Sequence, residues 1–167
     1  MKILIVTEPG VDGAFRHVED LIDHLLGENH LVHFAYSDVR GSDRLVSLIA
    51  RVRAARGQTL NLRTSNRPQF TDFRAFRSLL RLHRKTRPDV VHAHSAKAGA
   101  LARLMKWCGV KTPVFYSPHA YYGMGRRSKL SAIFFNCLER FFARRSITIN
   151  CSRDESHFAS HNLHIPA

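Results

Sequence analysis

The sequence predicts an α/β protein with a Rossmann-like, doubly wound parallel sheet of about six strands and helices on both faces. Two observations support this prediction. Short apolar segments alternate with longer amphipathic segments, and the short segments are apolar throughout rather than at every second residue. Continuous apolar runs indicate strands buried on both faces, as in a parallel sheet. The length predicts one domain, residues 1–167.

The expected strands share this apolar character and are short. They span residues 2–7, 30–36, 58–62, 89–94, 113–117 and 146–151. The first, KILIVT, combines β-branched residues with an unbroken apolar run, which is typical of a central strand.

The expected helices fill the intervals between the strands, and their apolar residues recur every three or four positions. They span residues 14–27, 43–57, 72–85, 96–108, 128–145 and 152–162. Ser42 or Asp43 is expected to cap the second helix, and Gly57 to end it. Ser152 and Glu155 have the spacing of a capping box at the start of the last helix.

The charge is strongly basic and unevenly distributed. The formal net charge is +13, and residues 1–39, 40–87 and 88–167 carry net charges of −5, +11 and +7. A basic middle third indicates an anionic partner, which charge alone leaves open between nucleic acid, an acidic lipid surface and phosphorylated substrates.

The cysteine pattern and the hydropathy indicate a cytoplasmic protein. Three cysteines with no CxxC pair favour reduced thiols over a disulfide framework or a zinc ribbon. The apolar run at the N-terminus is too short for a signal peptide, and no segment approaches the ~20 apolar residues of a membrane span. We therefore expect a cytoplasmic chain that is soluble or peripheral at the inner face of the membrane.

The candidate binding site follows from the fold class, because ligands of such sheets bind beyond the carboxyl ends of the strands. Three loops should meet there: TEPGVDGAFR, SAKAG and PHAYYGMG. Gly10 and Gly13 in the first loop would let the backbone approach a phosphate. The loop matches neither GxGxxG nor a P-loop, so a simple tight turn explains the glycines equally well.

The segment HAHSAK, at the junction of a strand and a helix, has three interpretations: a metal site, a phosphate-binding site, or packing with a helix cap. His92 and His94 share one face of the strand, but no third ligand with metal spacing follows, so no metal is expected. Packing is favoured for His92 and ligand contact for His94, which is nearer the carboxyl end. Ser95 fits a helix cap, or else faces an anion together with Lys97 and the helix N-terminus.

His119 directly follows an expected strand, in a loop that also contains Tyr121, Tyr122 and Gly123. An imidazole among aromatic residues at the edge of the sheet suits hydrogen bonding to a polyhydroxylated ligand. A solvent-exposed loop histidine is the alternative interpretation.

A family resemblance rests on four segments that occur in a fixed order along the chain. They are GVDGAFRHVEDLIDHL, RPDVVHAHSAKAGALARL, TPVFYSPHAYYGM and FFNCLERFFARRSITINCSRDES. Together they resemble the N-terminal domain of a GT-B glycosyltransferase of the retaining family 4, of the bacterial capsular, exopolysaccharide or O-antigen type. The resemblance covers nearly the whole chain. It implies transfer of a sugar from a nucleotide-sugar donor to a lipid-linked glycan acceptor in cell-surface polysaccharide synthesis.

The resemblance also implies roles for individual residues. Gly13 would lie at the interdomain cleft near the donor diphosphate, and Arg16 and His17 match the basic pair that commonly follows. His119 matches the histidine of the PHG-like motif, which implies contact with the donor sugar near the reacting centre. Ala120 replaces the usual glycine of that motif. The HAHS segment matches a block on the acceptor side of the cleft.

GT-B enzymes have two Rossmann-like domains, and this chain ends at NLHIPA, about where the family crosses to the second. The resemblance therefore implies the acceptor half of a site, inactive without a C-terminal donor domain or a partner chain. An excised domain, a truncated product and a subunit remain open. The resemblance implies nucleotide-sugar as a substrate and no metal or other cofactor.

The basic residues of the expected helix 72–85 form a stripe beside Phe73, Phe76 and Leu80. They are Arg74, Arg77, Arg81 and Arg84. Such a helix, with the basic helix 43–57, suits an anionic membrane surface, and solvated arginines on sheet-packing helices are the alternative. A nucleic-acid-binding module has only the charge in its favour, because the motifs of such modules are absent, so no nucleic acid is expected. A non-catalytic partner subunit is a further alternative.

Overall fold

A computed structural model describes residues 1–8, 12–39, 41–65, 69–125 and 128–165. The strands are β1 (Lys2–Thr7), β2 (Leu31–Tyr36), β3 (Thr59–Asn61), β4 (Val90–His94), β5 (Val114–Ser117) and β6 (Ile147–Thr148). The helices are α1 (Asp12–Gly27), α2 (Asp43–Ala54), α3 (Thr71–Thr86), α4 (Ala96–Trp107), α5 (Lys129–Ala143) and α6 (Arg153–Asn162), with a 3-10 turn, η1 (Tyr122–Met124). The predicted order of strands and helices is confirmed, whereas η1 was not predicted.

The six strands form one parallel sheet in the order β3-β2-β1-β4-β5-β6. The chain builds outward from β1 in one direction and then from β4 in the other, so the topological switch point lies between these two strands. Thr7 pairs with His94, and His94 with Ser117, so the carboxyl ends of β1, β4 and β5 lie side by side. The predicted doubly wound α/β fold is confirmed.

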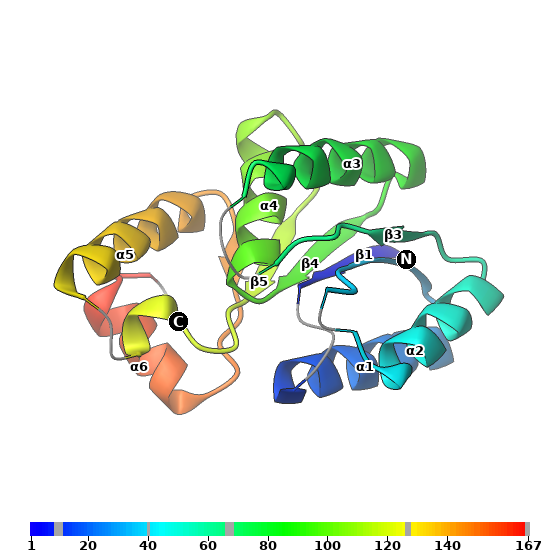
Figure 1. The fold of residues 1–167 in the computed structure, drawn as a ribbon, viewed down its shortest axis with the longest axis horizontal. Coiled ribbons are helices and arrows are strands. Elements are labelled where there is room, and N and C mark those ends of the chain that lie inside the picture. Colours follow the sequence, from blue (N-terminus) through cyan, green and yellow to red (C-terminus); the bar gives the residue numbers. More distant parts are fainter. Residues whose placement is uncertain (9–11, 40, 66–68, 126–127, 166–167) are drawn as a thin grey trace.

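Helices cover both faces of the sheet, as predicted (Figure 1). Helices α1 and α2 pack on one face, where Ile5, Phe34 and Leu48 belong to one apolar cluster. Helices α3 and α4 pack on the other, where Leu79 and Met105 belong to a second. Helices α2 and α3, which carry much of the basic charge, therefore lie on opposite faces.

Helices α5 and α6 lie together at the β6 edge of the sheet (Figure 1). The predicted strand over 146–151 is reduced to the two residues of β6, and a small third cluster that includes Tyr121 and Leu163 packs there. Much of α5 remains uncovered, with Leu130, Ile133 and Phe134 each at least 59% exposed. No helix among the described residues is long and apolar enough to cross a membrane.

A buried ion pair links α5 to the rest of the fold. Arg103 on α4 is 2% exposed, and its two terminal nitrogens donate to the Glu139 carboxylate of α5 at 2.7 and 3.2 Å. Its guanidinium also stacks on the ring of Tyr116, 3.8 Å from the centroid. Burial alone would lower the pKa of Arg103, but the Glu139 carboxylate reverses this, so the pKa is raised and the side chain stays charged.

The helix ends correct two sequence predictions. Ser42 precedes α2 but its side chain accepts no capping hydrogen bond, and α2 ends at Ala54 rather than Gly57. A side chain at Gly57 would meet the Val32 carbonyl at 2.1 Å, so this glycine is required by close packing against β2. At α6 the Ser152 hydroxyl accepts from the Glu155 amide at 3.1 Å, as a capping box predicts.

Candidate functional site

The carboxyl edge of β1, β4 and β5 gathers most of the candidate residues at the topological switch point. Gly10 lies outside the described residues. Gly13, at the start of α1, is exposed, and a side chain there would meet no atom within 4 Å. Among the described residues nothing occupies the space beside Gly13, so no packing against them requires a glycine.

Three histidines from separate parts of the chain meet at this edge: His94 at the end of β4, His119 after β5, and His17 on α1. His94 Nδ1 lies 3.0 Å from His119 Nε2, so one imidazole donates to the other. The ring centroid of His17 is 5.7 Å from that of His94 and 5.3 Å from that of His119, and the latter two are 5.3 Å apart. One ring nitrogen from each residue lies within 4.8 Å of the other two.

The exposure of the histidines increases from the sheet outward. His94 is completely buried, His119 is half-buried and His17 is exposed. A ligand would therefore reach the cluster through His17 and His119, and the ligand contact expected for His94, whose side chain has no exposed surface, stays a prediction. Among the described residues, His94 Nε2 has no hydrogen-bond partner.

Burial keeps the inner histidines uncharged. It lowers the pKa of His94 to about 2 and that of His92 to about 4, with smaller contributions from neighbouring histidines. His119 also has a lowered pKa, chiefly through burial and secondly through His17. His92 packs as expected: its ring is 4.0 Å from that of His94, and its Nε2 lies 3.0 Å from Ser117 Oγ.

The loop that carries His119 is held by α6. His119 and Ala120 both have positive φ, 51° and 92°. The Glu155 carboxylate fixes this backbone, because it accepts from the Ala120 amide at 2.8 Å and from the Cys151 amide at 2.8 Å. Glu155 was expected only to cap α6, and its contact with the loop was not predicted. Tyr121 is 3% exposed, so it anchors the loop in the small cluster rather than lining an open cleft.

The N-terminus of α4 lies directly after His94. Ser95 occupies the cap position, but its side chain makes no capping hydrogen bond, and its hydroxyl is buried with no partner among the described residues. Its backbone, at φ 77° and ψ 158°, lies in a region that residues other than glycine rarely adopt. The predicted helix cap is therefore wrong, and a strained serine with an unused hydroxyl stands at the edge of the sheet.

The two predicted basic groups at this edge differ in their surroundings. Lys97 Nζ donates to both carboxylate oxygens of Asp72 on α3, at 3.0 and 2.9 Å. Its anionic partner here is thus a protein carboxylate. Arg16 is exposed on α1, next to His17.

The four arginines predicted to face a membrane, Arg74, Arg77, Arg81 and Arg84, are all exposed on α3. None of them forms an ion pair within the described ranges. Phe70 and Phe73 are exposed near them, whereas Phe76, also expected beside this stripe, is buried.

Helix α2 differs from α3, because two of its three arginines form ion pairs with α1, and the third, Arg53, donates to the Thr59 hydroxyl. Both Arg44 and Arg51 bond to the Glu19 carboxylate of α1, and Arg51 also bonds to Asp23. The basic charge of α2 is therefore largely offset by the acidic face of α1. Since α2 and α3 also lie on opposite faces of the sheet, a single flat membrane cannot contact both, and α3 is the better candidate.

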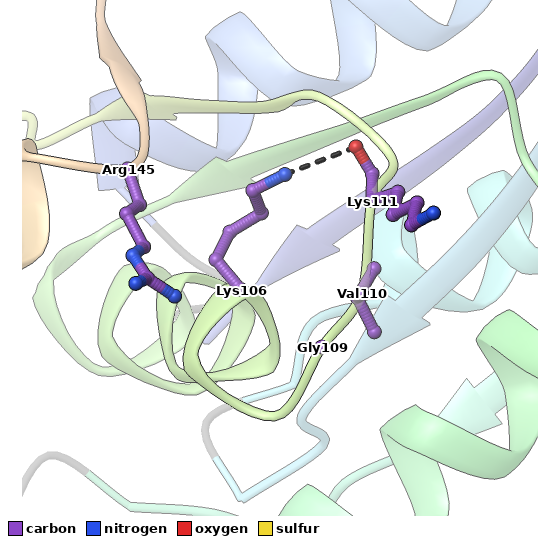
Figure 2. Close-up of a pocket in the computed structure, with 5 residues that line it drawn as sticks. All are labelled: Lys106, Gly109, Val110, Lys111 and Arg145. Carbon is purple, nitrogen blue, oxygen red and sulfur yellow. Dashed lines mark hydrogen bonds between the residues drawn. The ribbon is translucent and has the colours of Figure 1, made fainter.

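A basic hollow of about 540 Å³ lies at the other end of the sheet, before β5 (Figure 2). Lys106, Lys111 and Arg145 line it. The Lys106 ammonium donates to the Lys111 and Thr112 carbonyls at 3.0 and 3.2 Å, so it already has polar partners. The hollow contains none of the residues described above and lies at the amino ends of the strands, where such sheets do not usually bind ligands.

Comparisons with known proteins agree with this fold. The profile of Glycosyltransferase Family 4 matches residues 11–167. Sucrose-phosphate synthase from Thermosynechococcus elongatus is similar in structure (TM-score 0.66, 11% identity, 99% of this chain and 45% of that chain). A glycosyltransferase from Rickettsia africae is also similar (TM-score 0.68, 14% identity, 98% of this chain and 40% of that chain). So is the UDP-GlcNAc 2-epimerase of Neisseria meningitidis (TM-score 0.61, 18% identity, 94% of this chain and 42% of that chain). The chain thus spans less than half the length of these structures. No curated protein matches the sequence.

Proposed function

Because the chain belongs to glycosyltransferase family 4 and has the Rossmann-like fold of a GT-B N-terminal half, we propose that it forms the acceptor side of a sugar-transfer site. The proposed reaction moves a sugar, with retention of configuration, from a nucleotide-sugar donor to a lipid-linked glycan acceptor in polysaccharide synthesis. The observation that carries the proposal is the placement of His119 at the carboxyl edge of the switch point, in a backbone fixed by Glu155.

His119 is the proposed contact to the donor sugar. Since its Nε2 faces His94 Nδ1, the other ring nitrogen remains for a sugar hydroxyl. An uncharged imidazole can donate there while accepting from His94, and the lowered pKa of His119, due first to burial, favours that uncharged form at neutral pH. Contacts of this kind accelerate transfer when they strengthen in the transition state.

The anionic part of the donor or acceptor has a suitable place beside His119. The N-terminus of α4 favours negative charge, and the Ser95 hydroxyl, which has no partner among the described residues, can donate to a phosphate oxygen. Arg16 and the space beside Gly13 lie on the same edge. We propose that most nucleotide contacts come from a second, C-terminal domain, supplied by the same chain or a partner.

Membrane contact through α3 is part of the proposal. Its four exposed arginines and the exposed rings of Phe70 and Phe73 suit the interface of an anionic bilayer, at about 1 kcal/mol per basic residue near the surface. This would hold the protein at the cytoplasmic face of the membrane, near a lipid-linked acceptor.

The deciding experiment is sugar transfer to a lipid-linked acceptor, by the 167-residue chain alone and with a C-terminal family 4 domain supplied. We expect transfer only in the second case, and at least about 100-fold less with His119→Ala, in the range of lost general or electrostatic catalysis. His24→Ala, an exposed histidine on α1, is the control. Full activity of His119→Ala would refute the assigned role, and activity of the chain alone would refute the requirement for a second domain.

A companion experiment tests the membrane. Vesicles with and without acidic lipid are mixed with the protein and with a variant in which Arg74 and Arg77 are replaced by glutamine. We expect binding to acidic vesicles only, weakened in the variant, whereas Arg44→Gln on the paired helix α2 should have little effect. Binding to random duplex DNA with equal strength and a steep salt dependence would favour a nucleic-acid module instead.

A further inference from the structure

The geometry of the histidine cluster points to a function that neither the family nor the sequence pattern assigns: we propose that His17, His94 and His119 together bind one divalent transition-metal ion, with zinc as the probe. The sequence pattern predicted no metal, because only His92 and His94 are close along the chain. The fold supplies the missing ligands from α1 and from the loop after β5.

The distances between the rings fit a shared metal. With metal–nitrogen bonds of about 2.05 Å and tetrahedral angles, three imidazole nitrogens lie about 3.3 Å apart and the ring centroids about 5.2 Å apart. The observed centroids form a triangle of 5.3, 5.3 and 5.7 Å. The closest nitrogens, on His94 and His119, are 3.0 Å apart. The three ring nitrogens lie within 4.8 Å of one another, so the exposed His17 ring would have to move by up to about 1.5 Å to complete the set.

The protein leaves the bonding of this cluster incomplete. His94 is fully buried, yet its Nε2 has no partner in the described part of the chain. The 3.0 Å approach of His94 to His119 also requires at least one nitrogen lone pair between them, and such a lone pair is what a metal binds. The nearby Glu155 carboxylate, which holds the loop, contributes negative charge that favours a bound cation.

Three protein ligands leave the fourth position of a tetrahedral ion open, as in catalytic rather than structural zinc sites. The exposed His17 places this position toward the edge of the sheet, where a water or a phosphate oxygen could occupy it. The metal would also engage His119. If the proposed function is correct, zinc and the donor sugar therefore compete for this residue, and zinc inhibits transfer. Metal binding itself does not depend on the proposed function.

The test is zinc binding to the 167-residue chain at pH 7 by isothermal titration calorimetry, with X-ray absorption of the zinc complex. A second histidine pair must first be removed: His157 and His161 are exposed, one turn apart on α6, with ring centroids 4.0 Å apart. The reference protein therefore carries His157→Gln and His161→Gln. We expect one zinc per chain, with nitrogen ligands at about 2.0–2.1 Å.

His17→Gln is the decisive variant, because His17 is exposed and its replacement should leave the fold intact. We expect it to weaken zinc binding by at least about 10-fold, the lower limit for losing even an outer contact of a metal site. His94→Gln and His119→Gln should do the same, and His24→Gln should have no effect. The proposal is overturned if the reference protein binds no zinc, or if its affinity is unchanged by His17→Gln.

Discussion

Removing the carboxylate partner of the buried Arg103 should be among the most damaging single changes in this chain. Glu139→Ala leaves a guanidinium that is 2% exposed without its counter-charge, a change that typically destabilises a protein by about 3–5 kcal/mol. The stacking of Arg103 on Tyr116 and its bond to the Gly99 carbonyl at 3.2 Å remain, so we expect the lower half of that range.

Urea unfolding followed by circular dichroism measures this effect. With a slope of about 2 kcal/mol per molar urea, typical of a domain of this size, a loss of 3–4 kcal/mol lowers the midpoint by about 1.5–2 M. The matched control is Asp23→Ala, which removes a partner of Arg51 in an exposed pair, where we expect about 0–1 kcal/mol. The replacement of both Arg103 and Glu139 by methionine should be less damaging than Glu139→Ala alone.

The importance of the buried ion pair is refuted if Glu139→Ala lowers the free energy of unfolding no more than Asp23→Ala does, at an unchanged urea slope. The same holds if the double replacement is the more damaging, because the cost would then come from lost packing rather than from an unpaired charge.

Three further predictions concern stability. The pKa of His33 is lowered, first by burial and second by Lys2, and its Nδ1 accepts from the Gln58 amide at 3.0 Å. Because the unfolded state then binds the proton more readily than the folded state, the free energy of unfolding should fall as the pH drops below about 6.5. His33→Asn, which retains an acceptor, should make the stability profile less steep between pH 6.5 and 5, with His92, His94 and His119, whose pKa values burial also lowers, accounting for the slope that remains, and an unchanged slope would contradict this. Gly57→Ala should destabilise the fold by about 1–3 kcal/mol, because the added methyl group clashes with the β2 backbone. Gly27→Ala is the control, since a methyl group there meets no described atom within 4 Å, and equal urea midpoints for the two variants would exclude the clash. Ala120→Gly should stabilise the fold by up to about 1 kcal/mol, because glycine adopts φ 92° without strain, and the thermal midpoint should therefore rise. A lowered midpoint would show that the loop is not strained.

The sequence predicted the fold well because each strand and helix carries its own periodic signal. The apolar run KILIVT and the helical spacing of the following segment need no knowledge of distant residues. Predictions failed where tertiary packing decides. The strand over 146–151 is reduced to Ile147–Thr148 at the open edge of the sheet. Phe73 and Phe76 were both expected beside the arginine stripe, and only the packing of α3 on the core shows that Phe76 is buried and Phe73 exposed.

The candidate site could be located from the sequence but not assembled. The carboxyl ends of the strands follow from the fold class, and His94, Ser95 and His119 were found that way. The meeting of His94 and His119 with His17 depends on how α1 and the last loop pack, for which spacing along the chain gives no signal. The inward position of Tyr121 likewise depends on α6, and the strained backbone of Ser95 is visible only in three dimensions.

The attachment of α5 and α6 through a two-residue strand has a consequence for motion. We call β6, α5 and α6 together the corner. Because the corner has few strand hydrogen bonds and a small apolar cluster, it should unfold locally at a lower free energy than the central sheet, and amide hydrogen exchange should detect it as an independent unit. Glu155 lies in that unit and holds the backbone beside His119. Each opening of the corner would therefore release the histidine loop, so its exchange rate sets an upper limit on how long the site stays assembled.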